Sequence, residues 1–161
     1  MNHKLVNSVI NPIVKPILRS PFRTLLPSYW AVLTYTGRKT SKKHELPVRV
    51  AEYGEEFIAV PGCFGEIPAA WWRNFRKESM VDLLYRGKPM ECFARAIEND
   101  ETVAVPRLAT YLRNFPSERL GITAETTEEM FNKLVTMAAK TYSIVAIRPC
   151  SRSNSPDALS C

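Results

Sequence analysis

The pattern of apolar and polar residues divides the chain into three segments. Between residues 28 and 149, short runs of β-branched and aromatic residues alternate with glycine and proline, which predicts a domain built mainly of strands. Before residue 28, apolar residues recur at helical spacing. We therefore predict an amphipathic basic segment over residues 1–27, one globular domain over residues 28–149, and a disordered tail rich in Ser, Asn, Pro and Asp over residues 150–161.

The central segment predicts five or six strands with short helices between the later ones. Strands are expected over residues 30–36, 46–53, 57–60, 80–85, 90–97 and 142–148. Helices are expected over residues 69–77, over about 101–115 with Asn99 or Asp100 as N-cap, and from Thr126 or Thr127 to Ala139. Because strands and helices do not alternate as βαβ units, the order favours a mainly β fold, a small closed or half-closed antiparallel barrel.

Positive charge is concentrated at one end of the chain. The sequence has 22 Lys and Arg against 16 Asp and Glu, and its first acidic residue is Glu45. Eight of the basic residues precede it, so the remainder is slightly acidic, with 14 basic and 16 acidic side chains. A localised positive field suits an anionic ligand or an anionic membrane, and nucleic-acid binding is not expected.

The apolar repeat in residues 1–27 has two interpretations. It is either a basic amphipathic helix that lies on anionic lipid or a terminal segment that packs its apolar face on the barrel, and we favour the second. No apolar run approaches the length of about 20 residues that a membrane-spanning helix needs. No export signal opens the sequence, so a cytoplasmic location is expected, with peripheral contact at the inner face of a membrane left open.

Metal-binding and nucleophilic residues are sparse. Four cysteines are scattered without a CxxC pair, which favours neither a disulfide framework nor a zinc site: Cys63, Cys92, Cys150 and Cys161. The two histidines, His3 and His44, have no ligand-like neighbour in sequence, and we interpret His44 as a strand residue beside a binding loop. No metal site and no catalytic side-chain set are therefore predicted.

The stretch T-G-R-K-T-S-K-K-H-E-L-P, residues 36–47, is the first candidate binding element. A glycine turn between two strands offers backbone N–H groups, hydroxyls and cationic heads, all of which bind phosphate or carboxylate. The candidate residues are Arg38, Lys39, Thr40, Ser41, Lys42 and Lys43. A solvated basic hairpin is the alternative, and these residues alone do not decide between the two.

The second candidate element is the loop Pro61–Gly65 with the tryptophans that follow it. A glycine-containing loop lets a flat ligand approach the backbone, and an aromatic side chain beside it can cover the ring. Trp71 and Trp72 are neighbours, so helical geometry puts them on different faces and one of them is expected to belong to the core.

Over residues 30–121, the sequence resembles the deazaflavin-dependent nitroreductase and quinone reductase family. The resemblance rests on four stretches, in this order along the chain: LTYTGRKTSKKHELPV, AAWWRNF, LLYRGKPMECFARAIENDE and ATYLRNFP. The resemblance implies a split β-barrel of the FMN-binding type. It also implies hydride transfer from reduced coenzyme F420, a deazaflavin with a phosphate and glutamates in its tail, to a quinone, a nitro compound or an enone. Such a reaction needs the protein mainly to hold the ring against an acceptor.

The resemblance also implies roles for individual residues. The phosphate region of the coenzyme would be held by Arg38, Lys39 and Thr40, with Ser41, Lys42 and Lys43 beside the acidic tail. The edge of the ring would be lined by backbone groups of Val60, Pro61, Gly62 and Cys63, next to Trp71.

This sequence departs from the family at two places. Ser41 stands where the family has glycine, and Phe115 and Pro116 stand where some members have tyrosines near the substrate. The role of Cys63 is left open.

Two other functions fit the same residues. One is a split barrel that binds FMN, whose single phosphate also needs basic residues. The other is a non-enzymatic module that stores a cofactor or a lipid. A homodimer is compatible with all three.

Overall fold

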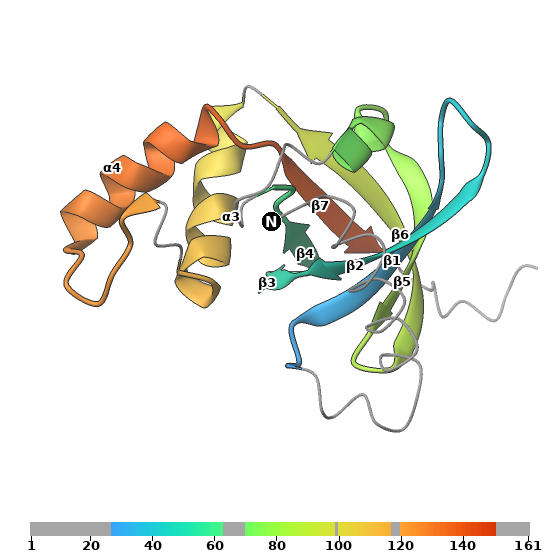
Figure 1. Ribbon diagram of the computed structural model, residues 1–161, viewed down its shortest axis with the longest axis horizontal. Helices are drawn as coiled ribbons and strands as arrows, with labels where there is room; N and C mark the ends of the chain where they lie inside the picture. The colour runs from blue at the N-terminus through green and yellow to red at the C-terminus, as the bar shows by residue number, and fades with distance from the viewer. Residues whose placement is uncertain (1–26, 63–69, 99, 117–119, 151–161) are drawn as a thin grey trace, which may run out of the picture.

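Seven antiparallel strands form one curled sheet in the part of the chain that the computed structural model describes, residues 27–62, 70–98, 100–116 and 120–150 (Figure 1). The strands are β1 (Trp30–Thr36), β2 (Lys43–Arg49), β3 (Ala51–Tyr53), β4 (Glu56–Ala59), β5 (Ser79–Tyr85), β6 (Lys88–Ile97) and β7 (Ile144–Pro149). The helical elements are η3, a 3-10 helix (Ala70–Phe75), α3 (Glu101–Asn114) and α4 (Glu128–Ala139). The sheet order is β2-β1-β5-β6-β7-β4-β3. The mainly β fold is confirmed.

The strand expected over residues 46–53 is wrong as a single element, because it divides at Val50. Its first part, β2, pairs with β1, and its second part, β3, pairs with β4 at the opposite edge of the sheet. At the break, the Val50 N–H donates to the Tyr29 carbonyl at 2.9 Å. Val50 packs in the barrel interior and Ala51 in the other core, so side-chain alternation continues through the break while the pairing partner changes. Two consecutive strands at opposite edges force the sheet to curl.

Contacts across the barrel interior bring distant strands together. Phe57 of β4 packs edge-on against Tyr85 of β5, with ring centroids 4.9 Å apart. The Tyr85 hydroxyl donates to the Glu52 carboxylate of β3 at 2.9 Å. Burial first, and then the Glu52 carboxylate, raises the pKa of Tyr85 to about 12, so the phenol stays a donor at neutral pH. Since β5 neighbours neither β3 nor β4 in the sheet, these contacts help to close the half-barrel.

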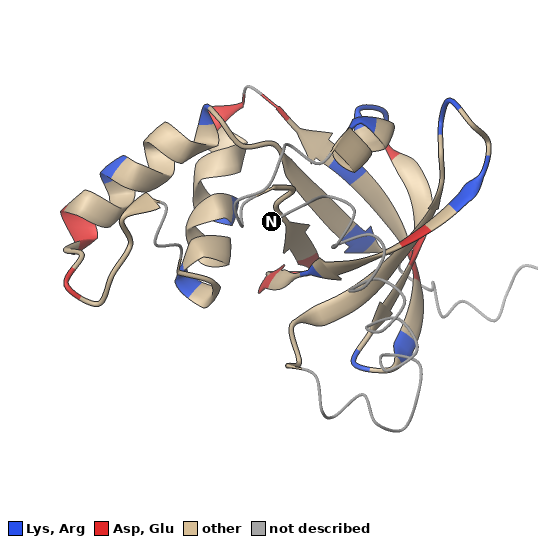
Figure 2. Ribbon diagram, viewed as in Figure 1, with Lys and Arg blue, Asp and Glu red and all other residues tan. Residues whose placement is uncertain are grey.

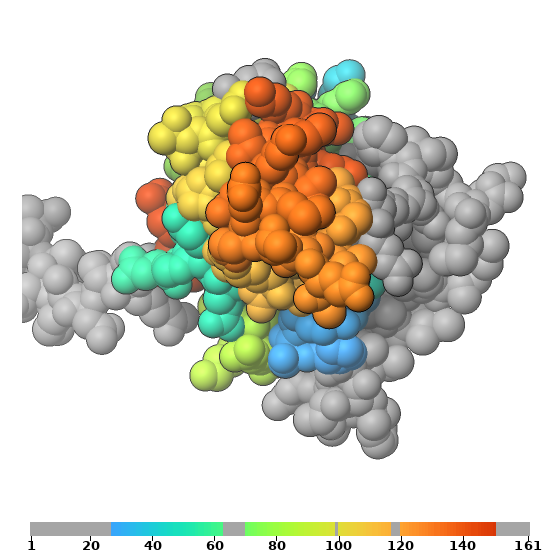
Figure 3. Space-filling model, turned by 90° about the vertical axis from the view of Figure 1, so that its left-hand side faces the viewer, coloured from blue at the N-terminus to red at the C-terminus, as the bar shows by residue number. Residues whose placement is uncertain are grey.

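Two apolar cores lie on the two faces of the sheet. Inward-facing residues such as Leu33, Leu83 and Ile147 fill the barrel, and Phe75 of η3 packs among them. On the outer face, α3 packs against β3 and β4, and α4 covers α3 as the outermost layer (Figure 3). β7 serves both cores, because Val145 packs in the barrel and Ile144 under the helices.

Side-chain caps fix where the two α-helices begin. The Asp100 carboxylate accepts the Val103 N–H at 3.2 Å, and the Thr127 hydroxyl accepts the Met130 N–H at 3.3 Å. The N-cap of α3 was expected at Asn99 or Asp100 and is Asp100, and that of α4 was expected at Thr126 or Thr127 and is Thr127. Such short polar side chains accept the N–H groups that the first turn of a helix leaves unpaired.

Other expectations differ in extent or fall outside the described residues. The helix expected over residues 69–77 is the shorter η3, and the closing strand ends at Pro149. The predictions for residues 1–26, Cys63 and residues 151–161 lie outside the described part of the chain. Within that part, no helix is long and apolar enough to cross a membrane.

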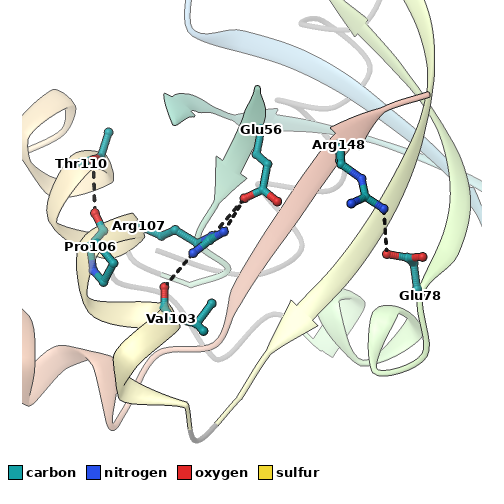
Figure 4. Close-up of polar contacts among 7 residues, drawn as sticks. All are labelled: Glu56, Glu78, Val103, Pro106, Arg107, Thr110 and Arg148. Atoms are coloured by element: carbon teal, nitrogen blue, oxygen red, sulfur yellow. Dashed lines mark hydrogen bonds and ion pairs between the residues drawn. The ribbon is translucent and has the colours of Figure 1, made fainter. Parts of the chain in front are cut away.

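An ion pair ties α3 to the sheet. Arg107 of α3 donates through Nε and Nη2 to the Glu56 carboxylate of β4, at 3.0 and 2.7 Å (Figure 4). The same guanidinium also donates to the Val103 carbonyl at 3.1 Å. The two side chains are only 19% and 24% exposed, whereas the nearby pair of Arg148 with Glu78 is 56% and 48% exposed.

We expect Arg107→Met to lower the free energy of unfolding by about 1–3 kcal/mol, because it leaves a partly buried carboxylate without its charged donors. Urea denaturation followed by circular dichroism measures this change. The matched control is Arg148→Met, for which a loss of no more than about 0.5 kcal/mol is expected. Equal losses for the two variants would contradict this assignment.

Candidate functional site

Residues 37–43, here named the cationic turn, join β1 to β2. The two strands stay paired as far as Thr36 with Lys43. The Gly37 N–H donates to the Lys42 carbonyl and the Ser41 N–H donates to the Gly37 carbonyl, both at 2.8 Å. The turn is therefore an ordered hairpin end whose backbone is closed by its own hydrogen bonds.

Two positions in the cationic turn suit glycine: Gly37 because there is no room for a side chain, and Ser41 because of its backbone conformation. A Cβ on Gly37 would lie 2.7 Å from the Thr40 hydroxyl and 2.8 Å from Nε2 of His44. Ser41 has φ of +52°, in the left-handed region that residues with a side chain rarely adopt. The turn thus keeps a glycine-like backbone at the position where the resembled family has glycine.

The charges of the cationic turn have one sign. Arg38, Lys39, Lys42 and Lys43 are all exposed, and none forms an ion pair within the described residues. Figure 2 shows basic residues at the tip of this hairpin and on η3, with no acidic residue at the tip. Such a cluster creates a local positive potential that attracts anions.

One amide joins the cationic turn to η3. The Arg38 N–H donates to Oδ1 of Asn74 at 3.0 Å, and Nδ2 of Asn74 donates to the Trp71 carbonyl at 2.8 Å. The structure therefore brings Arg38 and Trp71, two of the predicted site residues, to the two sides of a single side chain. Asn74 was not singled out from the sequence, although it is the uncharged polar residue of the quoted AAWWRNF stretch.

A row of rings runs from the cationic turn into the barrel, here named the aromatic row. His44 stacks on Tyr35 with centroids 5.4 Å apart and planes 25° apart. Tyr35 meets Phe75 edge-on at 5.2 Å, and Phe75 meets Trp71 edge-on at 6.1 Å. Burial raises the pKa of Tyr35, so its phenol is not an acid at neutral pH. These contacts fix the turn and Trp71 relative to the inner core.

The two tryptophans have different surroundings, although both are half-buried and both pack against the edge of the inner core. Trp71 meets Phe75, as described. Trp72 lies under the guanidinium groups of Arg73 and Arg76, at 5.6 and 5.0 Å from its ring centroid. Trp71 therefore belongs to the aromatic row, whereas Trp72 belongs to the basic surface of η3.

The expected ring-edge residues follow β4. Val60 is buried and its side chain packs in the outer core, so only its backbone can face a ligand. Pro61 is also buried, and Gly62 is half-buried with φ of +74°. These positions are compatible with contact through backbone groups, and Cys63 lies outside the described residues.

A cavity of about 320 Å³ lies away from these residues, between the outer face of β6 and β7 and the start of α3. Much of its polar lining is already paired, by Arg107 with Glu56, by Arg148 with Glu78, and by Arg76 with the lining residue Glu98 (Figure 4). None of the residues predicted to bind a ligand lines this cavity.

The described residues hold two free cysteines, Cys92, which is buried, and Cys150, which is half-buried. Cys92 is fully buried, and burial, with smaller effects from Cys150 and Asp82, raises the pKa of its thiol to about 11. A thiol with such a pKa is a poor nucleophile at neutral pH. Nowhere in the described ranges do three or more His, Cys, Asp or Glu side chains group as metal ligands would.

Residues 22–117 match the family described as F420H2-dependent quinone reductase. No curated protein matches the sequence.

Solved structures match at low identity. One is an F420H2-dependent reductase, FDR-A, 17% identical, with 76% of this chain and 96% of that chain covered and a TM-score of 0.52. Another is described as a domain-swapped dimer, 15% identical, with 88% and 98% covered and a TM-score of 0.53. A third, an FMN-binding protein related to pyridoxamine 5′-phosphate oxidase from Nostoc punctiforme, is 10% identical, with 86% and 78% covered and a TM-score of 0.53. These likenesses confirm the split-barrel fold.

We expect Ser41→Gly to raise the free energy of unfolding by up to about 1 kcal/mol, because relief of the left-handed backbone outweighs the added freedom of the unfolded chain. Gly37→Ala should have the opposite effect, since its methyl group would push Thr40 and His44 apart. Urea midpoints of the two variants test both signs. A Ser41→Gly variant that is less stable than the wild type would contradict this description of the turn.

Proposed function

Because the chain belongs to the F420H2-dependent quinone reductase family and is therefore an F420-dependent oxidoreductase, we propose that it transfers a hydride from reduced coenzyme F420 to a quinone. Nitro compounds and enones are the alternative acceptors. The observation that carries the proposal is the double hydrogen bond of Asn74, which joins the cationic turn to the helix bearing Trp71. The proposed polyanion site and the proposed surface for a flat ring would thus lie side by side.

The chemistry of the cationic turn fits the tail of the coenzyme, which carries a phosphate and glutamates. Arg38, Lys39 and Thr40 would hold the phosphate, with Ser41, Lys42 and Lys43 beside the glutamates. Charge-assisted hydrogen bonds of this kind are about twice as strong as neutral ones. Since the four cations have no carboxylate partner among the described residues, an anionic tail meets no competing ion pair there.

The ring would lie between the backbone of residues 60–63 and Trp71. When bound, reduced F420 supplies a two-electron hydride donor. The protein's part is to orient that donor and its acceptor and to exclude water, because correct placement alone removes a large part of a bimolecular barrier. The inner core and the aromatic row provide a rigid support for this placement. No side chain is assigned as an acid or a base.

FMN is the second candidate cofactor, because a structurally similar split barrel is described as FMN-binding. Flavin absorbance of the protein as purified would favour FMN over F420. A module that only stores a cofactor or lipid is the non-enzymatic alternative, and absence of turnover with any acceptor would favour it.

The setting of the enzyme is a further part of the proposal. A homodimer is supported by the similar structure described as a domain-swapped dimer, and light scattering would test it. A cytoplasmic location is proposed from the sequence alone, and so is contact of residues 1–27 with anionic lipid, the less favoured of the two interpretations of that segment. Sedimentation with liposomes, with and without those residues, would test the contact.

We expect the double variant Arg38→Glu/Lys39→Glu to bind F420 at least tenfold more weakly, a loss of about 1.4 kcal/mol or more, because two attractive charges become repulsive. Quenching of tryptophan fluorescence measures the affinity. The control Lys88→Glu/Lys133→Glu makes the same change in net charge at exposed positions away from the turn and should bind almost as the wild type does. Equal losses in both variants would indicate a general charge effect and contradict a site at the turn.

We expect quinones to give the highest kcat/KM in an assay of reduced F420 oxidation against quinones, nitro compounds and enones. The reason is that the family to which the chain belongs is described as one of quinone reductases. Absorbance of oxidised F420 follows the reaction. Turnover of nitro compounds without turnover of quinones would contradict quinone reduction while leaving F420 dependence intact.

A further inference from the structure

His44 makes a contact that the proposed function does not use. Its Nε2 lies 3.3 Å from the Thr40 hydroxyl, at the base of the cationic turn. The imidazole is held in this place by its stacking on Tyr35, which is itself buried and packed against Phe75. Gly37 leaves room for it, since a Cβ there would lie 2.8 Å from Nε2.

The Thr40 hydroxyl has one proton and two lone pairs to share. The Lys42 N–H donates to Oγ1 at 3.4 Å and so uses one lone pair. The protonation of His44 Nε2 decides how the hydroxyl proton and the second lone pair of Thr40 are used. If Nε2 carries no proton, it accepts the hydroxyl proton of Thr40, and that proton is lost to any ligand. If Nε2 is protonated, it donates to Oγ1, and the hydroxyl proton can point outward to an anion.

We propose that His44 is a positioning residue for the anionic end of the coenzyme, acting through Thr40. Its imidazolium form directs the Thr40 hydroxyl proton to a phosphate or carboxylate oxygen and adds a fifth positive charge to the turn. The inference rests on the proposed function. Because the charged ring favours bound anion, binding takes up a proton, and affinity falls as pH rises and the ring loses its charge.

The elements beside His44 carry other titratable and charged groups. β1 presents Tyr35, whose pKa is raised by burial. The cationic turn carries four cations, the next residue of β2 is Glu45, and η3, whose Phe75 packs against Tyr35, carries Arg73: these groups are Arg38, Lys39, Lys42, Lys43, Glu45 and Arg73. They are the same in the wild type and in His44→Gln, so the comparison of the two proteins isolates the imidazole.

The test measures F420 affinity from pH 5.5 to pH 8 at constant ionic strength, for the wild type and His44→Gln. The glutamine amide can donate to Thr40 at every pH and has no charge to lose. Any titration of the coenzyme itself is common to both proteins. We expect the ratio of the two dissociation constants to change about fivefold over this range, as the charged donor of the wild type is lost while the glutamine donor stays. A ratio independent of pH would overturn the inference and leave F420 binding standing.

A second measurement follows the imidazole of His44 directly. The chain has two histidines, so the ring proton signals of His44 can be assigned by their loss in His44→Gln. We expect the titration midpoint of His44 in wild-type protein to rise when F420 binds, and to rise less in Thr40→Val. An unmoved midpoint with F420 bound would overturn the inference. Failure of the wild type to bind F420 at any pH would overturn the proposed function and this inference with it.

Discussion

The side-chain amide of Asn74 joins η3 to the cationic turn. Its partner there, Arg38, lies 36 residues earlier in the chain. The amide accepts the backbone N–H of the cationic turn and donates to the carbonyl of Trp71, so both ends of one short side chain are used. Four like charges in an exposed hairpin repel one another, and the basic surface of η3 adds to that repulsion. The hydrogen bond between Arg38 and Asn74 holds the turn beside η3 in spite of it.

The barrel makes this link through Asn74 possible. Because β2 and β3 are consecutive in sequence but lie at opposite edges, the sheet curls and opens one end toward η3. Phe75 enters that end among the inner core residues, with Tyr35 and Trp71 against its ring. Burial of Phe75 thus fixes η3, Tyr35 fixes the base of the turn, and Asn74 joins the two. Apolar packing positions a site whose own chemistry is polar.

Much of this could be predicted from the sequence, because local signals carry it. The strands around Gly37, the turn after Tyr85 and the caps of α3 and α4 all follow from residues close together in the chain. The break at Val50 was missed, because apolar residues continue through it and only pairing with distant strands reveals it. Asn74 was missed for a similar reason. The role of this polar residue depends on its hydrogen bond with Arg38, and the sequence does not show that the two residues lie side by side.

The most direct test is a crystal structure of the protein with F420 bound. We predict that the phosphate lies within hydrogen-bond distance of Arg38, Lys39 or Thr40, that the deazaflavin ring lies beside Trp71, and that the Asn74 hydrogen bonds are intact. A coenzyme bound in the cavity between α3 and the outer face of β6 and β7, with the cationic turn free, would contradict the account.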